Sequence, residues 1–277
     1  PYPKRGLVFS PEPQDAIVGM GGTIDRLVEQ GHEVRLVSMT SGSLRVADSE
    51  ADKFASTLLE LASNAANPSD WSHQTNYARE VLRILEEKGE FGEDPALLRH
   101  LKGLVLRGEL RDAGHALGIP GDQVVILDLP FYERGRYRRF QISNEDTLSV
   151  TQLLQDFKPH QIYATGDAAD PSSVSALCFR LIGAALKNCE SEEWASACSL
   201  WLYRGKEKPM EPHEIDMAVP MSPVQLECKT RALSRYAALS SLESGAAESN
   251  RENARQYDAL GMAEYEAIET FQRWKRN

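Results

Sequence analysis

Two segments of this 277-residue sequence gather side chains that can do chemistry. Residues 10–16 read Ser-Pro-Glu-Pro-Gln-Asp-Ala, and residues 166–175 read Gly-Asp-Ala-Ala-Asp-Pro-Ser-Ser-Val-Ser. Their carboxylates are Glu12, Asp15, Asp167 and Asp170. Carboxylate oxygens are the ligands that Mg²⁺ and Ca²⁺ prefer, so the sequence permits an oxygen-rich metal site. For the Asp-Pro pair at 170, the sequence favours a cap at the start of a helix over a metal ligand.

Neither segment matches a serine hydrolase or a dinucleotide site. Ser172 and Ser175 have no histidine close by in the sequence, and they lack the glycine pattern of a nucleophile elbow. Gly19, Gly21 and Gly22 precede a predicted helix, but their spacing does not meet G-x-G-x-x-G. We therefore expect these glycines to allow tight turns and close helix packing.

Short apolar runs alternate with amphipathic stretches along the chain, which predicts an α/β fold with a parallel sheet covered on both faces. Ligands bind beyond the carboxyl ends of strands in such sheets. The loops after residues 10, 39, 129 and 166 are therefore expected to rim the site. The predicted strands are 6–10, 33–39, 123–129, 161–166, 198–203 and 214–219. The predicted helices are 21–29, 49–66, 74–88, 95–117, 144–157, 172–188, 222–239 and 250–270, with 240–249 as a mobile loop.

The composition argues against several classes of protein. A formal net charge of −10 disfavours a sequence-independent nucleic-acid binder, because neutralising phosphates needs clustered Lys and Arg. Four cysteines without C-x-x-C spacing suit reduced, buried thiols. No apolar run reaches the roughly 18 residues of a membrane span, and no signal peptide is recognisable. We expect a cytoplasmic protein that binds neither nucleic acid nor membranes.

Short motifs outside the two loops extend over nearly the whole chain. They are GMGGT at 19–23, GHEV at 31–34, TSG at 40–42, RGE at 107–109, LPFYE at 129–133, KPHQI at 158–162, WLYRG at 201–205 and EIDMAVP at 214–220. Together they resemble the PIG-L/LmbE zinc deacetylases of amino sugars, in the subgroup found as the C-terminal domain of glucosamine-6-phosphate deaminase-like proteins. The resemblance implies a Rossmann-like three-layer α/β/α sandwich with a mostly parallel sheet. It also implies a single domain over 1–277, with a helical insertion at about 49–118 and C-terminal helices at about 222–270.

The resemblance further implies what the two loops should contain. In this family the first loop reads Pro-His-Pro-Asp-Asp, in which the His and the second Asp bind zinc and the first Asp is the general base. Here Glu12 replaces the His and Gln14 replaces the base, whereas Asp15 is retained. The family's His-x-x-His, which supplies an acid or oxyanion-stabilising His and a zinc ligand, is replaced by Ser172 and Ser175. A further His expected within 234–238 is also absent.

These replacements predict that the family's zinc chemistry is lost. Zinc prefers imidazole, thiolate and carboxylate ligands, and a serine hydroxyl is a poor donor to it. Gln14 cannot act as a base, because its amide oxygen is nonbasic and its NH2 group only donates. We therefore expect no bound cofactor, Asp15 as a metal ligand at most, and an inactive homologue of N-acetylglucosamine-type deacetylases.

Ligand binding does not require catalysis. Thr40, Ser41, Arg107, Tyr132 and Arg204 are the candidate substrate-binding residues, because their side chains offer donors to the hydroxyls or phosphate of a sugar. Each arginine is equally able to pair with a carboxylate at the surface.

Three hypotheses follow from these residues. The first is a homologue without turnover that binds an amino sugar or a sugar phosphate, or that supports a partner domain. The second is an active amidohydrolase that uses a carboxylate site built on Glu12, Asp15 and Asp170. The third is a structural module of a longer chain, fused to or associated with a deaminase-like domain, which the start of the sequence at Pro1 permits. Any of the three is compatible with a homo-oligomer.

Overall fold

A computed structural model describes residues 2–89, 92–134, 140–205, 210–239 and 242–275 of the chain. The chain forms two compact units. The larger unit combines Pro1–Ser41 with Glu109–Asn277, and the smaller unit is Gly42–Gly108. Helix α4 (Ala96–Ala116) begins in the smaller unit and ends in the larger one. No helix of the described residues is both long and apolar enough to cross a membrane.

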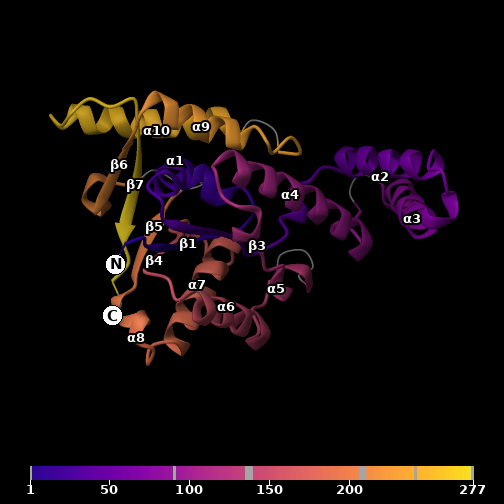
Figure 1. Ribbon diagram of the computed structural model, residues 1–277, viewed down its shortest axis with the longest axis horizontal. Helices are drawn as coiled ribbons and strands as arrows, with labels where there is room; N and C mark the ends of the chain where they lie inside the picture. The colour runs from indigo at the N-terminus through magenta and orange to yellow at the C-terminus, as the bar shows by residue number, and fades with distance from the viewer. Residues whose placement is uncertain (1, 90–91, 135–139, 206–209, 240–241, 276–277) are drawn as a thin grey trace. The chain divides into compact units, whose positions relative to one another are not determined.

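The larger unit is built on a mixed sheet, in which the described residues form seven strands in the order β3-β2-β1-β4-β5-β7-β6 (Figure 1). The five strands from β3 to β5 are parallel, whereas β7 is antiparallel to both of its neighbours. The mostly parallel α/β sheet is therefore confirmed. The strands are β1 (Arg5–Ser10), β2 (Glu33–Ser38), β3 (Val124–Ile126), β4 (Gln161–Thr165), β5 (Ser199–Tyr203), β6 (Met217–Met221) and β7 (Ala267–Arg273).

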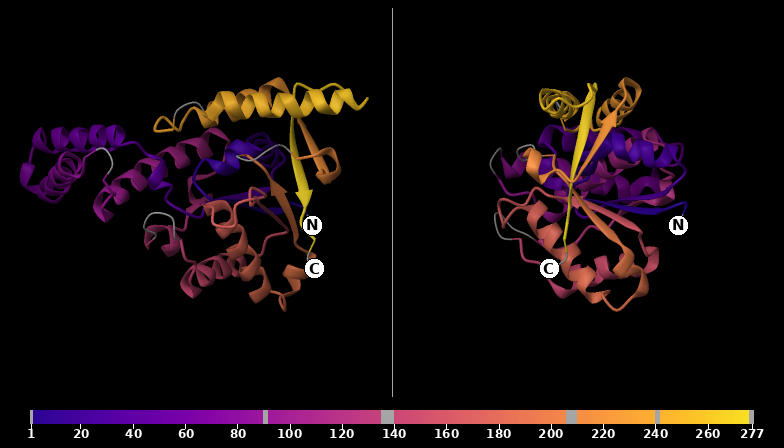
Figure 2. Two further views of the ribbon diagram at one scale, coloured as in Figure 1. Left: turned by 180° about the vertical axis from the view of Figure 1, so that it is seen from behind. Right: turned by 90° about the vertical axis from the view of Figure 1, so that its left-hand side faces the viewer.

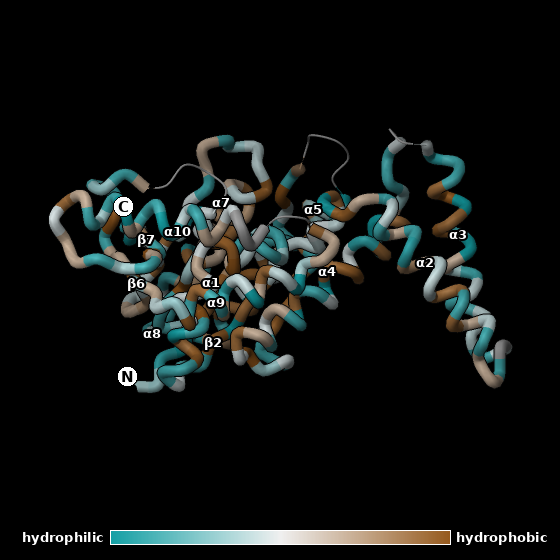
Figure 3. The backbone as a smooth tube through the Cα atoms, turned by 90° about the horizontal axis from the view of Figure 1, so that it is seen from above, coloured by the Kyte–Doolittle hydropathy of each residue, from teal (hydrophilic) through white to brown (hydrophobic). Residues whose placement is uncertain are grey.

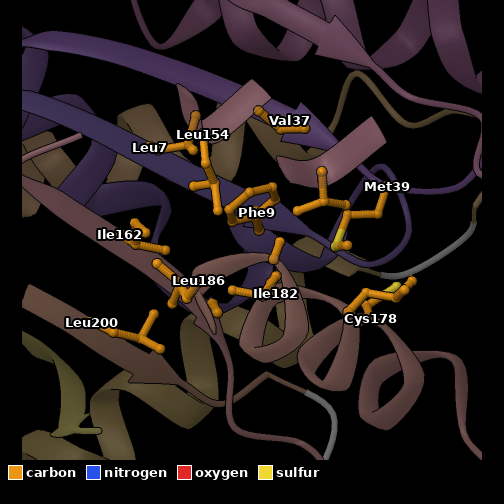
Figure 4. Close-up of a cluster of buried hydrophobic side chains, with 14 of the residues drawn as sticks. Leu7, Phe9, Val37, Met39, Leu154, Ile162, Cys178, Ile182, Leu186 and Leu200 are labelled. Carbon is orange, nitrogen blue, oxygen red and sulfur yellow. The ribbon is translucent and has the colours of Figure 1, made fainter. Parts of the chain in front are cut away.

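Helices cover both faces of this sheet, which explains why its inner strands are apolar almost throughout. On one face, Leu7 and Phe9 of β1 pack with Leu154 and Ile182 in one buried cluster (Figure 4). Those two partners lie on α6 (Asn144–Phe157) and α7 (Val174–Asn188). The opposite face is covered by α1 (Asp15–Glu29), α9 (Pro223–Leu233) and α10 (Leu242–Ala259), as Figure 1 shows. The remaining short elements of this unit are η3 (Gly121–Gln123), α5 (Pro130–Arg134), α8 (Glu193–Ala197) and η4 (Pro212–Glu214).

Helix α1 starts in the first loop and packs very closely against the strands and helices around it. A Cβ atom added to Gly19 would lie 2.2 Å from the Tyr203 ring, and one added to Gly22 would lie 2.1 Å from the Met221 sulfur. Met20, between these glycines, leaves the helical conformation and kinks the helix. The expected close packing is therefore confirmed, whereas the expected place of these glycines in a turn before a helix at 21–29 was wrong, because α1 already begins at Asp15.

The smaller unit is helical. It contains η1 (Ser43–Arg45), α2 (Asp48–Ser63), η2 (Pro68–Trp71), α3 (Ser72–Lys88) and the first part of α4. Figure 3 shows hydrophilic and hydrophobic residues alternating along α2 and α3, as expected for helices with one buried side. Ala51, Ala55, Val81 and Leu98 form its core. The predicted helices 49–66, 74–88 and 95–117 agree with α2, α3 and α4 to within a few residues.

The C-terminal prediction was wrong in three places. The predicted helix 222–239 is too long, because α9 ends at Leu233. Residues 250–270 do not form one helix, because α10 ends at Ala259 and residues 267–273 form β7. Ile268 and Phe271 are buried there between β5 and β6, and this pairing outweighs the helical propensity of the segment. The expected mobile loop at 240–249 is largely helical, since α10 begins at Leu242; Ser240 and Ser241 lie outside the described residues. Figure 2 shows β7, in yellow, running beside β6.

Candidate functional site

The two loops singled out in the sequence follow neighbouring strands. β1 ends at Ser10 and pairs in parallel with β4, which ends at Thr165. From β1 the chain proceeds to β2 on one side, whereas β4 leads to β5 on the other side. The point between β1 and β4 is therefore the topological switch point of the sheet, where ligands bind in open α/β folds. Glu12, Gln14 and Asp15 follow one of these strands, and Asp167 follows the other.

The first loop is held together by its own side chains. Asp15 Oδ2 accepts a hydrogen bond from the Glu12 backbone N–H at 3.0 Å, and Asp15 Oδ1 accepts one from Gln14 Nε2 at 3.0 Å. Ser10 Oγ donates to the Glu12 carbonyl at 2.5 Å and accepts from the Ala16 N–H at 2.9 Å. Glu12, Gln14 and Asp15 are all buried. Asp15, retained from the family pattern, thus fixes the conformation of the loop.

Two buried tyrosines brace the backbone of the same loop. Tyr203 Oη donates to the Phe9 carbonyl at 2.7 Å, and Tyr236 Oη donates to the Pro13 carbonyl at 2.8 Å. Burial, followed by the negative charges of Asp15 and Asp167, raises the pKa of Tyr203 well above its ordinary value. Burial and the charges of Asp15 and Glu109 raise the pKa of Tyr236 in the same direction. Both phenols therefore stay protonated and serve as donors.

The second loop has its own internal bonds. Asp167 Oδ2 accepts from the Gly205 N–H at 3.0 Å. Asp170 Oδ1 accepts from the N–H and the hydroxyl of Ser172, at 2.9 and 2.7 Å, and these two bonds lower the pKa of Asp170. The expected helix cap at Asp170 is displaced, because Ser173 is the N-cap of α7 and accepts from the Ala176 N–H. Ser175 is buried on α7, whereas Ser172 is exposed.

Most of the candidate substrate-binding side chains already contact other groups of the protein. Thr40 Oγ1 donates to the Pro11 carbonyl at 2.7 Å, and Ser41 Oγ donates to Glu133 at 2.6 Å. Tyr132 is 2% exposed and stacks on Phe140 with ring centroids 5.3 Å apart. Arg107 belongs to the smaller unit. These contacts support a structural role for Thr40, Ser41 and Tyr132 in the rim of the site.

Arg204 differs from Thr40, Ser41 and Tyr132, because part of its guanidinium group meets no partner among the described residues. Its terminal nitrogen donates to Glu214 Oε1 at 3.0 Å, while its buried Nε–H finds no acceptor in the described part of the chain. Arg204 also lines a small, mostly polar pocket, together with Val18, Gly19, Gly205, Gly245, Ala246, Ser249, Asn250, Asn253 and Thr270. An arginine N–H in such a pocket is a donor suited to a small anionic group.

The sequence did not single out Tyr203, Tyr236 or the Gly205 amide as site residues. Tyr203 and Gly205 lie within the WLYRG motif, and Tyr236 lies in the segment where the family carries a further His. Membership of these motifs was the only available signal, because the contacts join residues 223 positions apart in the case of Tyr236 and Pro13.

The side chains of the first loop do not fit a zinc ion. A catalytic zinc takes three nitrogen, sulfur or carboxylate donors from the protein and holds a water in its fourth position. The loop offers no imidazole, and both oxygens of Asp15 accept hydrogen bonds from the loop itself. In the described part of the chain, no three His, Cys, Asp or Glu side chains gather as metal ligands.

The mostly parallel α/β sheet and the loops beyond its strands can be compared with known proteins. The model of the PIG-L family, GlcNAc-PI de-N-acetylase, matches residues 7–174. A glucosamine-6-phosphate deaminase-like protein of Bacteroides thetaiotaomicron is 39% identical over 286 residues, which cover 98% of this chain and 43% of that protein. The chain therefore belongs to the PIG-L family, and it spans less than half the length of this curated relative.

Solved structures share the fold at low sequence identity. The 4-carboxy-2-hydroxymuconate hydratase GalB of Pseudomonas putida KT2440 has a TM-score of 0.64 and 15% identity, covering 99% of this chain and 97% of that one. The N,N'-diacetylchitobiose deacetylase of Pyrococcus horikoshii has a TM-score of 0.61 and 17% identity, covering 98% and 84%. A hydratase and a deacetylase thus use one scaffold, so the fold by itself does not set the reaction.

Proposed function

We propose that this chain is a PIG-L-family domain that binds an amino sugar or a sugar phosphate without hydrolysing an amide. One observation carries the proposal: the amide of Gln14, at the position of the family's base, donates to Asp15, the one retained ligand. The amide oxygen of Gln14 is nonbasic and its NH2 group only donates, so this side chain cannot take a proton from water. The same bond occupies one carboxylate oxygen of Asp15.

The physical consequence is the loss of water activation. A catalytic zinc lowers the pKa of its bound water to about 7, and a neighbouring base then removes the proton. With Glu12 and Gln14 in the first loop, and Ser172 and Ser175 in the second, this chain provides neither a zinc donor set nor a base.

Arg204 supports the binding part of the proposal. Its partly unpaired guanidinium group lies beyond β5, next to the loop that carries Asp167. Such a group pairs with phosphate or sugar oxygens. The relative of Bacteroides thetaiotaomicron is named glucosamine-6-phosphate deaminase-like, and a ligand of amino-sugar chemistry, or a deaminase-like partner domain, is consistent with that name.

The carboxylate amidohydrolase is the weaker alternative. It needs Asp170 to join Glu12 and Asp15, but Asp170 is exposed and its Oδ1 is bonded to Ser172. Divalent ions added to such a site would stabilise the native protein against heat. We expect no shift of the melting temperature with Mg²⁺, Mn²⁺, Ca²⁺ or Zn²⁺.

The direct test measures metal and turnover on the same purified chain. We expect zinc well below one ion per chain, and no acetate released from N-acetylglucosamine or its 6-phosphate. We also expect glucosamine 6-phosphate to raise the melting temperature, since a ligand that binds the native state stabilises it. Stoichiometric zinc together with acetate release would refute the proposal.

A further inference from the structure

Two histidine side chains hold the start of β1 from its two sides. The Arg5 backbone N–H donates to His160 Nδ1 at 2.9 Å, and the Lys4 backbone N–H donates to His32 Nδ1 at 3.2 Å. His32 directly precedes β2 and His160 directly precedes β4, which are the two strands that flank β1 in the sheet. Each imidazole therefore ties the start of β1 to the beginning of a neighbouring strand.

These two contacts fix the protonation state of both rings. A backbone N–H can only donate, so the ring nitrogen that accepts from it must carry no proton. A neutral imidazole of this kind carries its single proton on Nε2. A second proton would sit on Nδ1 and would face the N–H group of Arg5 or Lys4. Protonation therefore removes the acceptor and sets two N–H groups against each other.

The charges around His160 also favour its neutral form. The charged groups that face this ring are Arg5, Lys4 and the amino terminus, which are all cationic. Burial, followed by the charge of Arg5, lowers the pKa of His160 below its ordinary value of 6.5. The Arg5 guanidinium is held in place, because it donates to the carbonyls of Phe157 and Lys158 at 2.9 and 2.6 Å.

The surroundings of His32 include one further titratable group. The Tyr2 ring meets His32 edge to face with centroids 5.4 Å apart, and the Tyr2 hydroxyl donates to the Gln30 carbonyl at 2.6 Å. Lys4 is the charged residue whose backbone His32 binds. Both imidazoles are half-buried, so protons from the solvent can reach them.

We infer that His32 and His160 form an acid-sensitive latch, in which protonation of the imidazoles frees the N–H groups of Lys4 and Arg5 and loosens the start of β1. The latch does not depend on the proposed function. Both histidines lie at the amino ends of parallel strands, and the loops after Ser10 and Thr165 lie at the opposite edge of the sheet.

The direction of the effect follows from the lowered pKa of His160. In the unfolded chain a histidine is mostly neutral above about pH 6.5, so the contribution of the latch is complete there. As the pH falls below that value, the unfolded chain takes up the proton more readily than the folded one. The contribution is lost as the pH falls through the lowered pKa of His160 in the folded chain.

Two measurements on the native chain test the latch. Two-bond ¹H–¹⁵N spectra of the histidine rings at about pH 7.5 should show no proton on Nδ1 of His32 and His160. Amide exchange, expressed as protection relative to an unstructured peptide, should fall at Lys4 and Arg5 by about tenfold between about pH 7.5 and 5. The amide of Val8, in the middle of β1, should change by less than about twofold. A proton on either Nδ1 at the higher pH, or unchanged protection at Lys4 and Arg5, would overturn the inference.

A pair of substitutions separates titration from structure. In the double variant His32→Asn, His160→Asn, each amide oxygen takes the place of Nδ1 as an acceptor that does not titrate. Its protection at Lys4 and Arg5 should therefore stay the same at both pH values. His73→Asn is the control, because His73 is exposed on α3, and it should keep the native loss in acid. A loss in the double variant as large as that of the native chain would contradict the latch.

Discussion

Lys229 Nζ lies 2.7 Å from Glu269 Oε1, and their side chains are 1% and 0% exposed. Lys229 also donates to Asn250 Oδ1 at 2.7 Å, and the Glu269 carboxylate accepts from the N–H groups of Gly22 and Thr23. This buried ion pair therefore joins α9 and α10 to β7 and to the glycine-rich part of α1.

We expect Lys229→Met to destabilise the fold by about 3–5 kcal/mol, because it leaves the Glu269 charge buried without its cation. Lys187→Met is the control, since Lys187 is exposed on α7, and its cost should stay within about 0.5 kcal/mol. Urea unfolding followed by circular dichroism measures both. Equal urea midpoints for the two variants would show that the Lys229–Glu269 pair contributes nothing to the free energy of unfolding.

Gly19→Ala should destabilise the protein by about 1–3 kcal/mol through overpacking. The new methyl group would lie 2.2 Å from a carbon of the Tyr203 ring, whose hydroxyl is held on the Phe9 carbonyl. Gly183→Ala is the opposite case, because on α7 the new methyl group would meet nothing within 4 Å apart from its chain neighbours and the nearby backbone of its own helix. Alanine should stabilise that helix by about 0.5–1 kcal/mol. The two melting temperatures should therefore move in opposite directions.

The smaller unit should lose stability at both ends of the pH scale. Burial favours a raised pKa for Asp48, but hydrogen bonds from Lys102 and Lys88 outweigh it and lower the pKa below 3.8. The contribution of Asp48 is therefore complete above about pH 4 and is lost as the pH falls through the lowered value. Burial opposes the charged form of Lys88 as well, yet Asp48 and Asp94 raise its pKa above 10.5, so its contribution is lost only at higher pH.

Hydrogen exchange of α2 and α3 across this pH range measures the effect. Asp48→Asn should flatten the acid side of the profile, whereas Asp52→Asn, an exposed change on the same helix, should leave it unaltered. The Asp48 side chain is 38% exposed, so the change in free energy should stay below about 1 kcal/mol. If stability falls at low pH in the same way in both variants, protonation of Asp48 is not the cause of the acid loss.

Restoring the family pattern should restore the metal. The variant Glu12→His, Gln14→Asp, Ser172→His, Ser175→His should bind zinc close to one ion per chain, as measured by elemental analysis, because imidazole and carboxylate donors replace hydroxyl and amide. The double variant in the first loop alone should bind much less. A folded fourfold variant without zinc would show that the geometry around the loops has changed as well.

The sequence predicted elements well where local signals agree. The predicted helix 144–157 coincides with α6, whose start is marked by Ser143 and Asp146 in a capping box. The start of the first loop was located correctly because it follows the apolar strand β1, but its end was not, because α1 begins at Asp15. Local signals failed at β7, since Ile268 and Phe271 are buried only through pairing with distant strands.

The candidate site was predictable in its residue types and not in its contacts. The replacements at Glu12 and Gln14 are visible in the sequence, but the turn of the Gln14 amide towards Asp15 is not. The bracing of the loop by Tyr203 and Tyr236 also depends on the folded chain, because each bond joins residues that are about two hundred positions apart.

The place of β7 between β5 and β6 also bears on synthesis at the ribosome. β6 emerges before β7, and among the described strands β7 is its only partner. A nascent chain therefore carries an unpaired edge on β5 until residue 273 is released. A premature stop codon shortly before Ala267 would make that edge permanent, and open strand edges of this kind drive aggregation.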